Sequence, residues 1–267
     1  MIAALFRRNV AANAIRVVAC AIGLLVWGAV LPLVYSAFGK TLGTFIRDNP
    51  LLSQFSQYGG GDLFSLTGAM AIGFIHPFTL LLMGIIAVGL PVISIAGERQ
   101  RGTLEVLLAR PISRHTLYLV LFAAGALFLG LLLALELAAN VVSASVVGVA
   151  GELDLARLPI LWLNGWLLFV AFMAIGFAAS VSFDRLAPAL GVTLLVLIVS
   201  YLLDVISSLW PDASWLGDYS LFGYVKAKPI LEGHVSPLDF GVLVVVIAVA
   251  VGYAWWEFPR RDIAAPS

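Results

Sequence analysis

The chain is poor in charged residues. Of its 267 residues only 11% are charged, while 62% are hydrophobic, whereas a soluble domain carries about 25% charged residues. The mean hydropathy is +1.06. This composition excludes an ordinary soluble protein and predicts an integral membrane protein. No stretch of about 50 residues is free of apolar runs, so we expect no separate compact soluble domain.

Other absences narrow the function. The single cysteine, Cys20, lies inside an apolar run, so it cannot form an internal disulfide and is expected to pack as a small apolar residue. The net charge is zero, which gives no overall basic field for nucleic acid. The letters Gly39, Lys40 and Thr41 match the end of a nucleotide-binding P-loop. However, Val34 stands where the first glycine of that motif is needed, so we expect this chain to bind no ATP.

Six runs are long and apolar enough to cross a bilayer, which takes about 20 mainly apolar helical residues. They cover residues 17–36, 70–96, 117–148, 158–182, 187–209 and 240–256. The third run is long enough to tilt or to project from the bilayer. Asp184, Arg185 and Pro188 supply a tight turn between the fourth and the fifth. The sequence thus predicts an all-α integral membrane protein, with a single transmembrane domain of six spans over residues 1–267.

The basic residues are divided unequally between the two sides of these spans. Six spans place both termini on one side, and short loops rich in Lys and Arg face the cytoplasm. One side holds ten of the 15 Lys and Arg residues: Arg7, Arg8, Arg16, Arg99, Arg101, Arg110, Arg114, Arg185, Arg260 and Arg261. The other side holds Lys40, Arg47, Arg157, Lys226 and Lys228. We therefore expect a protein of the inner (cytoplasmic) membrane with both termini in the cytoplasm.

Residues 1–16 have the pattern of a short helix that lies in the membrane interface. Their apolar positions share one helical face beside two arginines, and they are Ile2, Leu5, Phe6 and Val10, with Arg7 and Arg8. The apolar run that follows exceeds the about 7 to 15 residues of a cleavable signal peptide, so we expect it to stay as a span. A frayed basic leader is the alternative for residues 1–16.

Between the second and third spans lies a charged loop, residues 97–116, which reads GERQRGTLEVLLARPISRHT. Gly102 offers a break, and the hydroxyl of Thr103 is able to cap a following helix. Leu104, Leu107 and Leu108 recur at helical spacing and would form one apolar face.

The ends of this short helix also carry signals. Glu105 stands in its first turn, where the helix dipole favours a negative charge. Arg110 stands at its end, Pro111 stops it, and Ser113 is a candidate cap for the third span. A helix of about two turns is unstable alone, so it needs a docking surface. That surface is either the chain's own spans and lipid headgroups, with the arginines solvated, or a partner protein.

Residues 98–114, ERQRGTLEVLLARPISR, resemble the loop between the second and third spans of the ABC-2 type permeases of ATP-binding cassette exporters. That loop is commonly written E-R-x-x-G-T-L-E-x-L-L-x-x-P-x-S-R. The end of the chain, Phe258, Arg260, Arg261, Asp262 and Ile263, is similar to the family's F-x-R-R-D-hydrophobic ending. Residues 220–233, SLFGYVKAKPILEG, resemble its external stretch before the last span. The chain departs from the family at residues 117–122, LYLVLF, where a lysine is usual.

The resemblance implies a transport subunit rather than an enzyme. Residues 103–110 would be a coupling helix seated in a groove of a separate cytoplasmic ABC ATPase, which would bind ATP and Mg. The implied coupling residues are Glu98, Arg99, Arg101, Gly102, Thr103, Leu104, Glu105, Leu107, Leu108, Arg110, Pro111, Ser113 and Arg114. Two permease copies would work together, as a homodimer or with a sister permease.

Ionisable residues inside spans are candidates for function, because a charge at the bilayer centre costs about 2.5 to 3.5 kcal/mol on insertion scales. Glu136, with Asn140 one turn on, lies well inside the third span, and Asp204 lies near the outer end of the fifth. These three residues form a possible substrate path, with a packed structural role as the alternative for Glu136. His76 stands before Pro77 and has no cluster of metal ligands nearby in the sequence.

The inner half of the second span also contains Pro91, with Gly84 and Gly89 upstream. This pattern predicts a kink beside the charged loop, either a flexible point or a static bend.

The leading hypothesis is therefore an export permease powered by a separate ATPase. Two alternatives use Glu136, Asp204 and His76: a proton-coupled carrier, which would be expected to show inverted repeats, and an intramembrane hydrolase. The sequence contains no G-x-S-x-G nucleophile motif for the latter.

Overall fold

A computed structural model describes residues 2–47, 65–109 and 112–261, with the side chains of residues 40–47 left aside. Every regular element in these ranges is helical. In chain order they are α1 (Ile2–Arg47), α3 (Leu66–Ile75), α4 (Pro77–Ala87), α5 (Gly89–Val92), the π-helix η2 (Ile93–Gly97), α6 (Glu98–Gln100), α7 (Thr103–Leu108), α8 (Arg114–Val146), the 3₁₀ turns η3 (Ala150–Glu152) and η4 (Leu155–Arg157), α9 (Leu158–Ser182), α10 (Leu186–Leu209), the 3₁₀ turns η5 (Pro211–Tyr219) and η6 (Phe222–Tyr224), α11 (Ala227–Leu231) and α12 (Pro237–Arg260).

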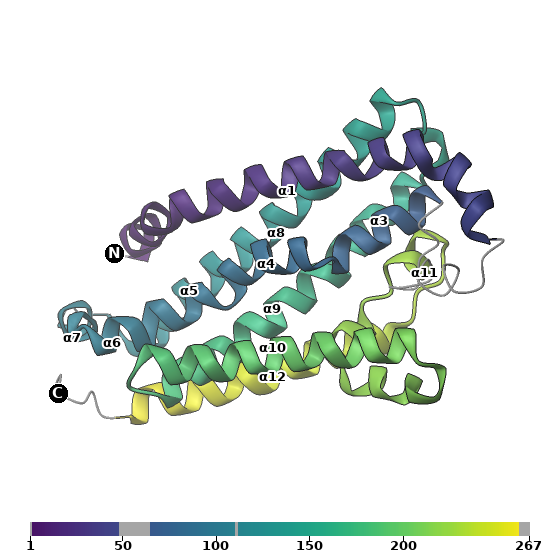
Figure 1. Ribbon diagram of the computed structural model, residues 1–267. Coiled ribbons are helices and arrows are strands. Elements are labelled where there is room, and N and C mark those ends of the chain that lie inside the picture. The colour runs from purple at the N-terminus through teal and green to yellow at the C-terminus, as the bar shows by residue number, and fades with distance from the viewer. Residues whose placement is uncertain (1, 48–64, 110–111, 262–267) are drawn as a thin grey trace.

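Among the described residues, six helical stretches are long and apolar enough to cross a membrane. They are Ile2–Gly39, Pro77–Gln100, Arg114–Val146, Leu155–Ser182, Leu186–Leu209 and Pro237–Arg260. They run side by side along one direction, and the short helices α6 and α7 lie at the same end of the bundle as the start of α1 and the end of α12 (Figure 1). The all-α fold with six candidate membrane helices is thus confirmed.

The second span was predicted as one run over residues 70–96, and this prediction was wrong, because the helix is interrupted inside that range. The chain forms α3, breaks at His76 and begins α4 at Pro77. Proline disfavours helical backbone in the residue before it, and His76 is extended, with φ −65° and ψ 142°. Its Nδ1 accepts the backbone N–H of Phe78 at 3.2 Å, so His76 caps α4. The membrane-spanning part consequently starts at Pro77.

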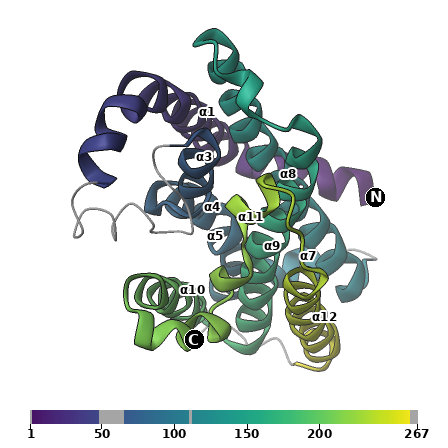
Figure 2. The same ribbon diagram turned by 90° about the vertical axis from the view of Figure 1, so that its right-hand side faces the viewer.

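Helix α9 occupies the middle of the bundle, with the other spans around it (Figure 2). It has the largest buried share of the six candidate spans. Small residues allow this close packing. A Cβ on Gly176 would lie 2.8 Å from Pro91 Cγ, and one on Gly165 would lie 2.7 Å from Phe74. Glycine at these positions therefore lets α9 approach the broken second span.

Helix α1 packs along α8. A Cβ on Gly28 would lie 2.5 Å from the carbonyl oxygen of Glu136, so only glycine fits this crossing without a shift. Ser143 Oγ of α8 donates to the carbonyl of Ala29 at 2.6 Å. Cys20 is buried in the same core.

The predicted interfacial helix, residues 1–16, is not a separate element, because α1 is continuous from Ile2. Its first turns nevertheless change direction. They are seen end-on in Figure 1 and side-on in Figure 2, so they run across the bundle. Leu5, Phe6 and Val10 pack against the core, while Ile2 is exposed.

Candidate functional site

The charged loop between the second and third spans, residues 97–116, closes one end of the bundle and contains α6 and α7. Gly102 separates these two helices with φ 70°, in the left-handed region that glycine adopts without strain. Helix α7 runs from Thr103 to Leu108, within the range of residues 103–110 that the resemblance implied. The predicted end at Arg110, together with Pro111, lies outside the described residues.

The two faces of α7 differ sharply. Leu104 is completely buried in the main hydrophobic core, and Leu108 packs against that core. On the opposite side Val106 is 69% exposed, and Glu105 and Ala109 are exposed as well. Of the two docking surfaces left open by the sequence, Leu104 and Leu108 use the chain's own helices, while Leu107 lines a cavity between α7, α1 and α8. The outer face of α7 is left uncovered among the described residues.

Thr103 does not cap α7, and that prediction was wrong. The N-cap is Gly102, which has no side chain, and Thr103 is the first helical residue. Its hydroxyl instead donates to the carboxylate and to the carbonyl of Glu98 in α6. The same carboxylate accepts a bond of 2.7 Å from Arg101 Nη2. Thr103 and Arg101 thus fold α6 and α7 against each other around Glu98, while Glu105 lies in the first turn as expected.

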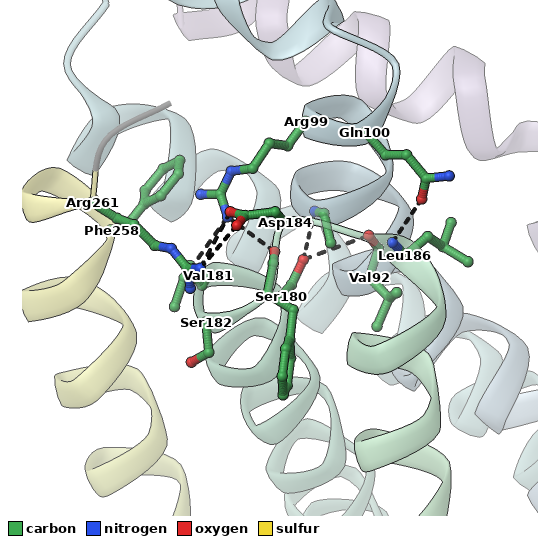
Figure 3. A network of polar contacts seen from close by, with 12 residues as sticks. Val92, Arg99, Gln100, Ser180, Val181, Ser182, Asp184, Leu186, Phe258 and Arg261 are labelled. Carbon is green, nitrogen blue, oxygen red and sulfur yellow. Dashed lines mark hydrogen bonds and ion pairs between the residues drawn. The ribbon is translucent and has the colours of Figure 1, made fainter. Parts of the chain in front are cut away.

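Arg99 is a buried structural residue. Its side chain is only 2% exposed, and Nη1 donates to the carbonyl of Phe183 at 3.0 Å and contacts Asp184 Oδ1 at 3.4 Å. Arg261 approaches the same place from α12, where Nη1 donates to the carbonyl of Val181 at 3.1 Å (Figure 3). These carbonyls are at the C-terminal end of α9, where helices have unpaired acceptors and attract positive charge.

Arg114 binds carbonyl groups at the C-terminal end of α12 in the same way. Its Nη1 donates to the carbonyls of Phe258 at 3.1 Å and Arg261 at 2.6 Å. Ser113 caps α8 as predicted, because its Oγ accepts the backbone N–H of Thr116 at 3.1 Å. The end of the loop is thereby joined to the end of the last span.

Two further contacts fasten the start of the loop to α9 and α10. Gln100 Oε1 accepts the backbone N–H of Leu186, the first residue of α10, at 2.8 Å (Figure 3). Ser180 of α9 accepts the backbone N–H of Ala96 at 2.8 Å, within the wide turn of the π-helix η2. The second span therefore contains a π-helix shortly after Pro91, where the sequence predicted a kink, and Ser180 binds a backbone N–H inside it.

Sequence reasoning treated the arginines of the loop as solvated or as held by a partner, and it missed their role as ties to helix ends. The sequence did carry a signal for this role in the turn at residues 183–186. That turn places a carboxylate, Asp184, at the end of the fourth span, on the same side of the predicted bundle as the charged loop. Arg101 does remain at the surface, 53% exposed, in its pair with Glu98.

Glu136 is fully buried in α8, beside the break in the second span. Pro77 has no N–H to offer the carbonyl of Gly73 four residues earlier. Thr79 Oγ1 and Trp27 Nε1 donate to that carbonyl instead, at 2.7 and 3.3 Å. Thr79 Oγ1 also lies 3.1 Å from Glu136 Oε1.

Asn140 completes this buried polar group. Its Nδ2 donates to the carbonyl of Glu136 at 2.9 Å. Glu136 Oε2 and Asn140 Oδ1 have no hydrogen-bond partner among the described residues. The structure therefore places Glu136 and Asn140 at a tight helix crossing.

Asp204 lies elsewhere, in a cavity of about 620 Å³ at the end of the bundle opposite to the loop. Lys226, Asp218 and Asp239 line the same cavity, together with serines of α10 and of the turns that follow. Glu136 does not line it. The predicted path residues are thus divided between a packed crossing and an open polar cavity.

His76 is occupied by packing and capping. Its ring lies 4.5 Å from that of Trp27, centroid to centroid. No group of three or more His, Cys, Asp or Glu side chains in the described ranges is arranged to hold a metal ion.

An apolar groove of about 440 Å³ separates α4 and α5 from α10. Leu81, Ile85 and Gly84 line one wall, and Leu194 and Ile198 line the other. A Cβ on Gly84 would meet no atom within 4 Å. The packing between the second and fifth spans is therefore open in this region.

Comparison with protein families matches residues 9–263 to the family described as ABC-2 family transporter protein. A comparison with curated proteins gave no match. The family match covers nearly the whole chain, including the charged loop, its arginines, most of the first candidate span and all of the other five. The chain therefore belongs to the ABC-2 transporter family and is a membrane permease subunit of an ABC transporter.

Proposed function

We propose that this permease subunit works as an exporter driven by ATP hydrolysis on a separate cytoplasmic subunit, and that the outer face of α7 is where that ATPase binds. ATP and Mg would be held by the ATPase, since this sequence has no P-loop. The observation that carries the proposal is the exposed face of α7, with Val106 at 69% exposure between Glu105 and Ala109.

The distribution of arginines supports a cytoplasmic position for α7. Arg8 and Arg16 of α1 line a cavity together with Arg101 of the loop, and Arg7 precedes Arg8 in the same helix. Arg114 of the loop contacts the end of α12. Basic residues in short loops favour the cytoplasmic side. Both termini would then lie in the cytoplasm, where the ATPase is.

The ties of the loop supply a route for mechanical coupling. A helix of six residues has little stability of its own, but Leu104 in the core and the bonds of Arg99 and Arg114 fix it to the ends of α9 and α12. A displacement of α7 by the ATPase would therefore move span ends rather than bend a loose loop. The motif residues would thus divide into two groups: those that face the ATPase, and those that attach α7 to the ends of the spans.

Two copies of the permease, identical or paired with a sister chain, would enclose the substrate path. The apolar groove between α4, α5 and α10 supports this arrangement, because an open groove of about 440 Å³ lined by Leu and Ile suits an apolar surface. The polar cavity around Asp204 at the opposite end would serve as the exit. Glu136 and Asn140, packed at the crossing of α1 and α8, would support the path rather than line it.

A photo-crosslinking amino acid placed at single positions of α7 tests the proposal in intact cells. At Val106 we expect capture of a protein that carries a complete P-loop, because this side chain is exposed. At Leu104, the matched control, we expect crosslinks only within the chain, because this side chain is buried.

Capture of a P-loop ATPase at position 106 and not at position 104 would support the assigned face. The proposal fails if no P-loop protein is captured at Val106, or if labelling with a membrane-impermeant reagent places residues 97–109 outside the cell. Transport assays with the captured ATPase then test the direction of transport.

A further inference from the structure

The N-terminal turns of α1, the π-helix η2, the charged loop and α8 line a partly open cavity of about 230 Å³ at the loop end of the bundle. This is several times the about 30 Å³ that one water molecule occupies in the liquid. Its polar wall is formed by Arg8, Asn9, Asn13 and Arg16 of α1, by Ser94 of η2, and by Glu98 and Arg101 of the loop. These residues belong neither to the outer face of α7 nor to the apolar groove.

A buried donor in this wall lacks an acceptor. Asn13 Nδ2 donates to Asn9 Oδ1 at 2.7 Å, and Arg16 Nη1 donates to Asn13 Oδ1 at 3.2 Å. These bonds fix the orientation of both amides, and Asn9 Nδ2 is left without a partner among the described residues. Asn9 is only 7% exposed. A buried donor without an acceptor costs about 1–3 kcal/mol, so an anionic oxygen in the cavity would relieve a real cost.

The charges around the cavity favour an anion. Three guanidinium groups, those of Arg8, Arg16 and Arg101, line it together with one carboxylate, that of Glu98, which leaves a net charge of +2. The carboxylate is already engaged by Arg101 and Thr103. Guanidinium groups bind phosphate oxygens with paired, charge-assisted hydrogen bonds.

The remaining wall is apolar and indicates where the phosphate comes from. Leu5, Leu107, Leu117 and Leu121 line the cavity from α1, α7 and α8. Leu117 and Leu121 stand in the first turns of a candidate membrane span. A free phosphate would gain nothing from these leucines, whereas a phospholipid would place its headgroup among the arginines and its glycerol and acyl carbons against them.

We infer that this cavity binds the phosphate of an anionic phospholipid, held by Arg8, Arg16 and the amide of Asn9. The bound lipid would contact α1, α7 and α8 together, so it would fix the N-terminal turns of α1 against the loop. The inference concerns the permease chain alone and does not depend on the ATPase or on the direction of transport.

Native mass spectrometry of the purified full chain tests this inference with two soluble lipids, dioctanoyl phosphatidylglycerol and dioctanoyl phosphatidylcholine. We expect the wild-type chain to bind phosphatidylglycerol at least tenfold more tightly than phosphatidylcholine. The double variant Arg8→Gln/Arg16→Gln should lose this preference at least tenfold, and both side chains are exposed, so the fold should be retained. The control Arg7→Gln/Arg260→Gln removes the same charge at the same end, away from the cavity, and should bind as the wild type does.

A second variant tests the amide. Asn9→Asp replaces the free donor by an acceptor with negative charge, and it should weaken phosphatidylglycerol binding without changing phosphatidylcholine binding. Equal losses in the two double variants would show only diffuse charge attraction and would overturn the site. Binding of inorganic phosphate that phosphatidylglycerol fails to displace would overturn the assignment to a lipid.

Discussion

The two faces of α7 contain neighbouring residues of one motif and differ in almost every physical respect. Leu104 is buried in the core, while Val106, two residues later, is largely exposed. The arginines divide in the same way, because Arg99 is buried against the end of α9 and Arg101 is exposed beside Glu98. The motif therefore combines buried residues that hold the loop in place with exposed residues that are accessible to a partner. Variants can separate the two groups.

The largest difference is expected between the two apolar residues of α7. Leu104→Ala leaves a cavity in the core and should lower the free energy of unfolding by about 2–5 kcal/mol. Val106→Ala removes an exposed side chain and should change it by less than about 0.5 kcal/mol. Thermal unfolding of both variants in detergent measures this, and equal losses would contradict the assignment of the two faces.

The arginine pair should show a smaller contrast. Arg99→Gln removes charged hydrogen bonds to Phe183 and Asp184, each worth about 1.5–3 kcal/mol at most. We expect about 2–3 kcal/mol of lost stability, with partial recovery in Arg99→Lys, which keeps the charge but not the planar fork. Arg101→Gln breaks an exposed pair, worth about 0–1 kcal/mol. Chemical denaturation of the three variants gives the values, and a loss for Arg101→Gln as large as for Arg99→Gln would refute this division.

An exposed charge should affect the partner and not the fold. Glu105→Lys should leave the unfolding temperature of the permease unchanged, because the side chain is exposed. It should weaken copurification of the ATPase by about tenfold, which corresponds to about 1.4 kcal/mol. Quantitative pull-down with Glu105→Gln as the milder control checks this. Unchanged ATPase binding by Glu105→Lys would remove Glu105 from the contact surface.

The smallest effect is expected inside the membrane part. Glu136→Gln keeps the size of the side chain and an oxygen within reach of Thr79, so stability should change by less than about 1 kcal/mol and transport should persist. Loss of transport at unchanged unfolding temperature would return Glu136 to the substrate path. Vesicle transport assays alongside thermal unfolding decide between the two roles.

Much of the fold could be predicted from the sequence, because bilayer thickness and hydropathy determine which runs form spans. The cap at Ser113 and the turn at Asp184 also follow local rules and were predicted. The break at His76 was missed although Pro77 marks it, since apolar composition continues through it and hides the interruption.

The candidate site was less predictable, because its contacts join residues far apart in the chain. Arg114 meets α12 across more than 140 residues, and Arg99 meets α9 across more than 80. Periodicity showed that α7 has an apolar face but did not reveal that this face docks inward. The cavity around Asn9 is lined by residues of α1, η2, α6, α7 and α8, and it left no local signal.

The π-helix η2 links the second span to α9 through the hydroxyl of Ser180. Ser180 accepts the N–H of Ala96 in that turn and lies 3.5 Å from the carbonyl of Val92, so the hydroxyl sits inside the hydrogen-bond ladder of the neighbouring helix. If either helix slid along the other, these buried groups would lose their hydrogen-bond partners. These contacts therefore join the second and fourth spans to each other, whereas an apolar groove separates the second span from α10.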